Sequence, residues 1–180
     1  MTMTATALAA DAITAHELRF ERLMPAPIDT VWAYLVDPDL RKLWFMGGAT
    51  GRSAGEEIEM VMDHRNLSDE DVPMPERYAA YLGKGWSEKI VRIEPPHLLS
   101  FTWDNGDAGT VMIELSEGGE GTRLVLTHSG LRGPADAVNF GGGWHAHIEV
   151  LKRRIGGERV PDFWALHADA EAKMRAAIGS

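Results

Sequence analysis

The fold of this chain is decided by residues 98–128, which read LLSFTWDNGDAGTVMIELSEGGEGTRLVLTH. Apolar and polar side chains alternate there in three runs, and this period of two is typical of half-buried strands. The runs cover about 98–104, 109–117 and 121–128. They are separated by Asn105-Gly106 and by a glycine-rich turn at 118–121, and both turns favour tight hairpins. Connections this short exclude crossover helices, so the stretch predicts an antiparallel meander.

Similar patterns extend the sheet toward the N-terminus. Alternation recurs over 17–24, 56–64 and 84–94, which predicts a curved antiparallel sheet of about six strands. Between the first two strands, Ile28 to Val36 shows helical spacing, and Asp37-Pro38 begins a second short helix that should end near residue 47. The polar, proline-punctuated loop at 66–82 is expected at one end of the sheet.

The C-terminal part of the chain predicts helices. Glycines at 141–143 precede the longest helical pattern, in which Trp144, Ile148 and Leu151 share a face. We interpret these glycines as a flexible start of the helix, with anion binding by free N–H groups as the alternative. A further helix follows Pro161 to about residue 178. A sheet with one solvated face needs a cover for the other, so the expected fold class is α+β, with the sheet wrapped on the long C-terminal helix.

Strand parity predicts which side chains face that helix. They combine methionine, aromatic and aliphatic side chains with two histidines, a mixture typical of ligand cavities and equally of packed cores. The candidate cavity residues are Met60, Met62, His64, Phe101, Trp103, Val111, Ile113, Leu126, His128, Trp144, Ile148 and Leu151.

His64 and His128 are the candidates for catalysis. Either could orient a ligand or act as a general base, and Arg65 could also move a proton. The alternative is a histidine that is hydrogen-bonded to the backbone near a strand end. We expect no metal and no cofactor: His145 and His147 point apart on a helix, and the phosphate-loop, dinucleotide and nucleophile-elbow motifs are absent from the sequence.

Composition bounds the classes of function. The chain has 180 residues, which predicts one domain at 16–180 after a flexible tail at 1–15. With 18 Lys and Arg against 27 Asp and Glu, the formal charge of −9 disfavours nucleic-acid binding. The chain contains no cysteine, which suits a reducing compartment, so we expect a cytoplasmic protein. No stretch approaches the ~20 apolar residues of a membrane span.

Tryptophan is over-represented, with six against five phenylalanines and three tyrosines. Trp32 and Trp44 are expected to brace the short helices against the sheet, and Trp103 and Trp144 to reach the cavity. The pattern gives Trp86 and Trp164 no inward placement, so they are interpreted as surface or interface aromatics.

Four motifs carry a family resemblance. They are Glu21-Arg-Leu-Met-Pro-Ala-Pro27 with Asp37-Pro38, Glu94-Pro-Pro-x-Leu98-Leu-x-Phe101-Thr-Trp103, Gly121-Thr-Arg-Leu124-x-Leu-Thr-His128, and Gly143-Trp144 through Leu151. Over about 17–160 the chain resembles the START-like (SRPBCC) superfamily, and within it the branch named after the activator of heat-shock protein 90 ATPase. The resemblance implies a helix-grip fold whose cavity, in relatives, holds lipids, polyketides or other hydrophobic molecules.

Three hypotheses for function follow. The first is binding of a small hydrophobic molecule without catalysis. The second is an enzyme of the cyclase or dehydratase kind that uses a cavity histidine. The third is an interaction protein, either chaperone-related or a homodimer formed through the helix at 160–178. The separate N-terminal domain that eukaryotic chaperone activators use has no counterpart in this sequence, which weighs against a chaperone partner.

Overall fold

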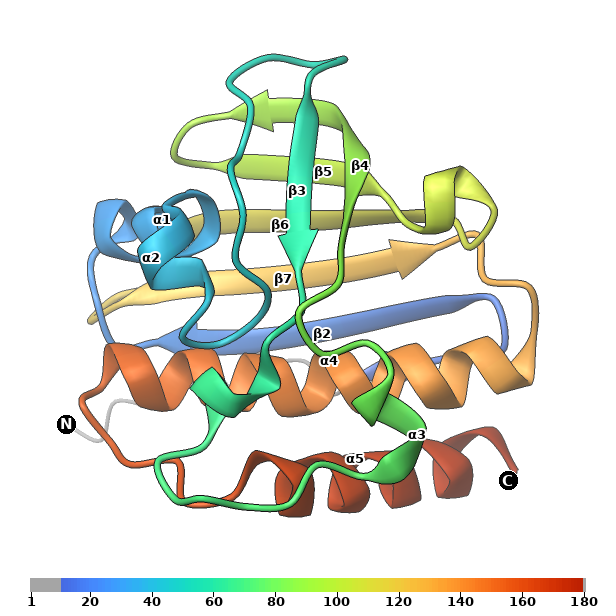
Figure 1. The fold of residues 1–180 in the computed structure, drawn as a ribbon. Helices are drawn as coiled ribbons and strands as arrows, with labels where there is room; N and C mark the ends of the chain where they lie inside the picture. The colour runs from blue at the N-terminus through green and yellow to red at the C-terminus, as the bar shows by residue number, and fades with distance from the viewer. Residues whose placement is uncertain (1–10, 180) are drawn as a thin grey trace, which may run out of the picture.

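The expected sheet is present in the computed structural model, which describes residues 11–179. Its strands are antiparallel and lie in the order β1-β2-β7-β6-β5-β4-β3 (Figure 1). They are β1 (Ala12–Ile13), β2 (Glu17–Met24), β3 (Glu57–Val61), β4 (Gly85–Glu94), β5 (Leu98–Thr102), β6 (Thr110–Glu117) and β7 (Thr122–Ser129). The predicted α+β helix-grip fold is confirmed, with seven strands in the described residues instead of about six.

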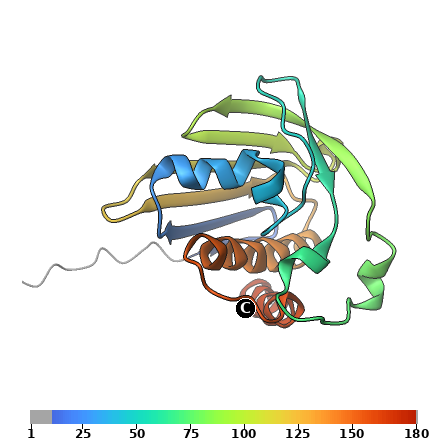
Figure 2. The ribbon, with the colours of Figure 1, turned by 60° about the vertical axis from the view of Figure 1, so that its left-hand side comes forward.

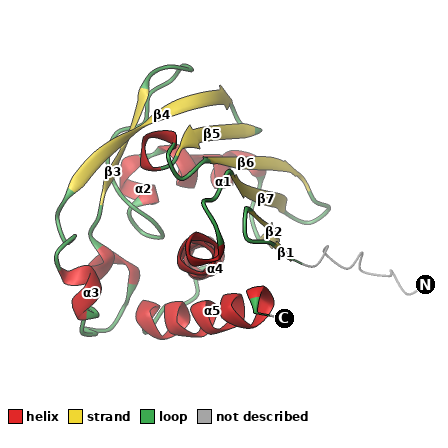
Figure 3. Cartoon of the chain, turned by 90° about the vertical axis from the view of Figure 1, so that its right-hand side faces the viewer, coloured by secondary structure: helices red, strands yellow, loops and turns green. Residues whose placement is uncertain are grey.

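The helices lie inside and below the curve of the sheet. They are α1 (Ile28–Val36), α2 (Pro38–Arg41), α3 (Glu76–Ala79), α4 (Pro134–Ile155) and α5 (Phe163–Ile178), with short 3₁₀ helices at His64–Leu67 (η1) and Asp104–Gly106 (η2). Viewed along α4, the sheet arches over this helix and α5 lies on its other side (Figure 3). Figure 2 shows α1 and α2 lying against the sheet. The long helix is therefore enclosed between two layers.

The central register is fixed by the buried face of the sheet. On β6 and β7, Val111 pairs with His128 and Ile113 with Leu126, and all four side chains are buried. A slip by one residue would turn this apolar set toward solvent, so the pairing is strongly specified.

The first strand, β1, lies inside the segment expected to be a tail. Ala12 pairs with Arg19 and Ile13 with Leu18, and Asp11 forms an ion pair with Arg22 at 2.6 Å. Order therefore begins ahead of residue 16. The rest of the predicted tail, residues 1–10, lies outside the described residues.

The strand expected to continue to residue 64 ends at Val61. The Asp63 carboxylate accepts a hydrogen bond from the Arg65 backbone N–H at 3.3 Å and from its guanidinium at 2.8 Å. This local bonding favours the turn η1 over a further strand residue. His64 is consequently placed on a turn below the sheet and not on the sheet itself.

The second short helix ends at Arg41 and not near residue 47. The Arg41 side chain is buried and donates to the carbonyls of Met46, Gly48 and Glu59 at 2.8, 2.6 and 2.7 Å. A guanidinium has five donors to satisfy, and the loop after α2 folds around it to supply acceptors. Burial lowers the pKa of Arg41 to about 10.

The interpretation of the glycine run as the flexible start of a helix is wrong. The helix α4 begins at Pro134, so Gly141 to Gly143 lie in its interior and their N–H groups are not free to bind an anion. A Cβ atom at Gly142 would lie 2.7 Å from Cγ of Glu171. A Cβ atom at Gly141 would lie 2.8 Å from Sδ of Met174. The first two glycines allow α5 to approach α4 closely.

Candidate functional site

A pocket of about 530 Å³ lies between the sheet, the middle of α4, and the α3 and α5 helices. Its volume is within the range of sites that hold small organic ligands. It is lined by Phe45, Met46, Met62, His64, Tyr78, Tyr81, Trp86, Glu88, Trp103, Asp104, Asn105, Asn139, Phe140, Gly143, Trp144, His147, Trp164 and His167. We call this space the aromatic pocket.

One wall of the aromatic pocket is a cluster of rings around Phe45. The ring centroid of Phe45 lies 5.0 Å from that of Trp144 and 6.3 Å from that of Trp103, and those two indoles are 5.4 Å apart. Phe140 meets Trp103 edge-on at 5.8 Å. These contacts hold large apolar surfaces in fixed orientations toward the pocket.

The opposite wall is built by α5 and α3. Trp164 stacks on the His64 ring at 5.5 Å and on the Tyr78 ring at 5.0 Å, with interplanar angles of 22° and 18°. Arg77 beside Tyr78 forms an ion pair with buried Glu171 at 2.7 Å, which ties α3 to α5. The loop at 66–82 is thereby fixed as part of the site.

Three buried histidines line this end of the pocket. His147 Nδ1 lies 2.8 Å from the Trp44 carbonyl oxygen. A carbonyl only accepts, so Nδ1 carries the proton and Nε2 keeps its lone pair. The His64 ring meets the His147 ring edge-on at 5.1 Å. His167 Nδ1 lies 3.8 Å from the Glu171 carboxylate.

Burial keeps these imidazoles neutral. Desolvation, with a smaller contribution from His167, lowers the pKa of His64 from its usual 6.5 to about 4. Desolvation also lowers the pKa of His147 well below 6.5 and lowers the pKa of His167. Within residues 11–179, His64 Nδ1 is the buried side-chain nitrogen that has no hydrogen-bond partner. Such an atom is costly to leave unpaired.

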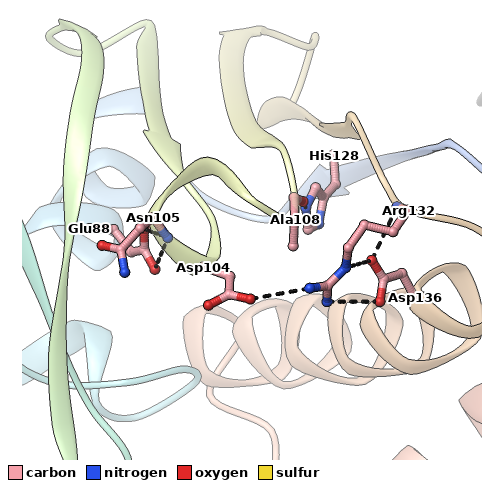
Figure 4. Close-up of polar contacts among 7 residues, drawn as sticks. All are labelled: Glu88, Asp104, Asn105, Ala108, His128, Arg132 and Asp136. Atoms are coloured by element: carbon pink, nitrogen blue, oxygen red, sulfur yellow. Dashed lines mark hydrogen bonds and ion pairs between the residues drawn. The ribbon is translucent and has the colours of Figure 1, made fainter.

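His128, the other candidate base, has both ring nitrogens engaged. Its Nε2 donates to the Ala108 carbonyl at 2.8 Å (Figure 4). Its Nδ1 accepts from Trp144 Nε1 at 3.0 Å. His128 lies outside the aromatic pocket and holds the Trp144 indole in place. In this arrangement neither ring nitrogen of His128 is free to take up or release a proton.

Arg65 is also unsuited to proton transfer in the pocket. Its side chain is largely exposed and forms an ion pair with Asp63 at 2.7 Å. Arg65 is not among the residues that line the pocket.

The acidic end of the pocket is held by hydrogen bonds. Glu88, which is only 1% exposed, accepts from the Thr102 hydroxyl at 2.6 Å and from the Asn105 N–H at 3.1 Å. Both Asp104 and Asn105 have positive φ, near 52° and 53°, and the Glu88 contact supports this turn. Arg132 joins Asp104 to Asp136 at the rim (Figure 4).

Four of the twelve residues predicted from parity line the aromatic pocket: Met62, His64, Trp103 and Trp144. The others are buried in the packed core: Met60, Phe101, Val111, Ile113, Leu126, His128, Ile148 and Leu151. Parity gives the face of a strand but not the position along it. On α4 the lining residues run from Asn139 to His147, so the pocket lies beside the middle of that helix.

Sequence reasoning missed several lining residues. Trp164 and Trp86, interpreted as surface or interface aromatics, both line the pocket, although Trp86 is also 37% exposed. From the sequence, His147 is considered only as a possible metal ligand, although its spacing of i+3 from Trp144 places it on the same helix face. Tyr78 comes from the single-turn helix α3 and Phe45 from an irregular segment, and both are too short for periodicity to carry a signal.

Two absences can be stated for the part of the chain that the structure describes. Residues 11–179 contain no group of three or more histidine, aspartate or glutamate side chains arranged to hold a metal ion. Over the same residues, no helix is both long and apolar enough to cross a membrane.

Known proteins with a similar sequence and fold place this chain in a family. The family model described as Activator of Hsp90 ATPase homolog 1-like protein matches residues 25–156. The solution structure of the protein encoded by gene BPP1335 from Bordetella parapertussis is 40% identical, with a TM-score of 0.78, over 97% of this chain and 94% of that one. No protein with a curated description matches.

Two further solved structures share the fold at lower identity. CalU16 from Micromonospora echinospora is 22% identical, with a TM-score of 0.68, over 97% of this chain and 100% of that one. DynU16, described as lying in the dynemicin biosynthetic locus, is 22% identical, with a TM-score of 0.61, over 82% of this chain and 50% of that one. The chain thus belongs to the Activator of Hsp90 ATPase homolog 1-like protein family, within the START-like superfamily.

Proposed function

We propose that this protein binds a small hydrophobic molecule in the aromatic pocket. The observation that carries the proposal is the pocket itself: about 530 Å³ lined by four of the six tryptophans, beside a core that is otherwise closely packed. Aromatic walls with a few polar groups that fix orientation are typical of ligand sites. We further propose that the ligand is a lipid, a polyketide-like molecule or an aromatic molecule, and that it is bound in the cytoplasm.

The first experiment is native mass spectrometry of protein purified without denaturant. A co-purified mass, released on unfolding and identified after extraction, would support the proposal. Protein that is always ligand-free, and that takes up no member of a panel of lipids and aromatic compounds, would contradict it.

A second candidate function is catalysis of the cyclase or dehydratase kind. The observation that favours it is the fixed tautomer of His147, whose Nε2 lone pair is the free site for a proton on a pocket-lining base. A positioned base contributes roughly 10²–10⁴-fold to rate. A His147→Gln variant that turned over the true substrate at the normal rate would exclude this role.

The interaction hypothesis receives less support from the structure. The apolar side of α5, with Phe163, Ala170 and Met174, is buried within the protomer and is not free for a second copy. A homodimer or a chaperone partner would need another surface. Sedimentation at several protein concentrations, alone and with the chaperone, tests both.

A further inference from the structure

The charges around the aromatic pocket restrict which ligands it can hold. Among the described residues, its lining includes the carboxylates of Glu88 and Asp104 but no lysine or arginine. The nearby cations Arg77 and Arg132 are already paired with Glu171, Asp104 and Asp136. A buried carboxylate on a ligand would have no cation to offset its lost hydration, and this loss is costly.

The histidine end of the pocket instead offers hydrogen bonds to a neutral group. His147 presents the Nε2 lone pair, because its Nδ1 proton is held by the Trp44 carbonyl. His64 is 5% exposed and lines the pocket. Its Nδ1, unpaired in residues 11–179, is also closed to solvent, so the nitrogen available to a ligand is Nε2. A ligand hydroxyl group both donates and accepts hydrogen bonds, so it can pair with an imidazole nitrogen whether or not that nitrogen carries the proton.

The shape of the same end favours a flat molecule. Trp164 stacks on both Tyr78 and His64, so planar groups are already layered along this wall. Across the pocket, Trp103 and Trp144 present further indole surface. The aromatic ring of a ligand can extend this stack, and the stacking stabilises binding beyond the contribution of the buried apolar area.

We propose that the pocket selects a neutral aromatic molecule whose hydroxyl group pairs with the imidazoles of His64 and His147, and that it rejects anionic ligands such as fatty acids. This selectivity rests on the proposed binding function. It narrows the ligand class from hydrophobic molecules in general to phenol-type compounds.

Four probes built on the same ring system test the proposal: naphthalene, 1-naphthol, 1-methoxynaphthalene and 1-naphthoate. Dissociation constants are measured at pH 7 by quenching of tryptophan fluorescence and by calorimetry. One net hydrogen bond predicts that 1-naphthol binds about 5-fold more tightly than naphthalene. We expect 1-methoxynaphthalene, which cannot donate, to bind like naphthalene, and 1-naphthoate to bind at least about 10-fold more weakly than 1-naphthol.

The matched variants are His64→Phe and His145→Phe. The first keeps a flat ring but removes the nitrogens, so the preference for 1-naphthol should fall to at most about 2-fold while naphthalene binding persists. His145 is on α4 but does not line the pocket, so its variant should bind all four probes as the unmodified protein does. Naphthalene binding reports that each variant is folded.

The outcomes separate the two proposals. If no probe binds the unmodified protein, the proposed function fails. If naphthalene binds but 1-naphthol has no advantage, or 1-naphthoate binds most tightly, only the selectivity is wrong. The same conclusion follows if 1-methoxynaphthalene matches 1-naphthol, or if His64→Phe keeps the full preference.

Discussion

Burial of His64 makes the stability of this protein depend on pH. Its pKa is about 4 in the folded protein and about 6.5 when the chain unfolds. Between these values the unfolded chain binds a proton that the folded chain does not, so acidification favours unfolding. Stability from this group is present above pH 6.5 and is lost as the pH falls toward 4.

The size of the effect follows from the same two values. Linkage predicts that His64 alone removes about 2 kcal/mol of unfolding free energy between pH 7 and pH 5. Buried His147 and His167 act in the same direction, so the total loss is larger. The contribution of His64 is therefore isolated by comparing the unmodified protein with His64→Phe.

The assay is urea unfolding at pH 7 and pH 5, followed by tryptophan fluorescence. The His64→Phe variant should lose about 2 kcal/mol less than the unmodified protein, roughly 1 M in the urea midpoint. Met62→Leu is the control, because it alters a pocket-lining side chain without a titrating group. Its pH dependence should match that of the unmodified protein. Equal pH dependence in His64→Phe would refute the burial of a neutral imidazole at this position.

Three other predictions concern packing and the pocket. Gly142→Ala should destabilise the protein by about 1–3 kcal/mol in urea unfolding, because its methyl group would press on the α5 backbone. Gly143→Ala, with open space at the same helix, should be neutral or stabilise it by up to about 1 kcal/mol. His128→Leu leaves two buried partners unpaired and should cost about 2–5 kcal/mol in the same assay. Trp164→Ala should weaken naphthalene binding at least about 5-fold in calorimetry, whereas Trp32→Ala, outside the pocket, should leave it unchanged.

Each of these predictions has a result that contradicts it. Equal effects of the two alanine substitutions on α4 would show that α5 does not pack closely on the glycines. A His128→Leu protein of normal stability would mean that the imidazole is not bridging Ala108 and Trp144. Equal losses of binding in the two tryptophan variants would place Trp164 outside the site.

The sheet could be predicted because its signals are local. Asn105-Gly106 and the glycines at 118–121 mark turns, and alternation between them assigns the faces of β5, β6 and β7. The same patterns could not locate the pocket, since its position depends on how far the core fills the sheet along its length. Val111 and Trp103 both pack in the hydrophobic core, yet only Trp103 lines the pocket.

The role of the α4 glycines and the pocket wall built by α3 and α5 could not be predicted from the sequence for a different reason. Gly142 contributes through a close contact with α5, and a single sequence does not show which segments meet. Trp164 and Tyr78 come together from segments that are far apart in the chain, and no periodicity links them. Contacts between segments this far apart in the chain can be known only from the folded structure.

Methionine methyl groups offer the most direct test of ligand binding in the aromatic pocket. Met46 and Met62 line it, whereas Met24 and Met174 are buried elsewhere. With ¹³C-methyl methionine, titration with naphthalene should shift the Met46 and Met62 signals saturably, through the ring current of the bound probe. The Met24 and Met174 signals should stay in place. No saturable shift at Met46 and Met62, or a shift confined to Met24 and Met174, would contradict binding at this site.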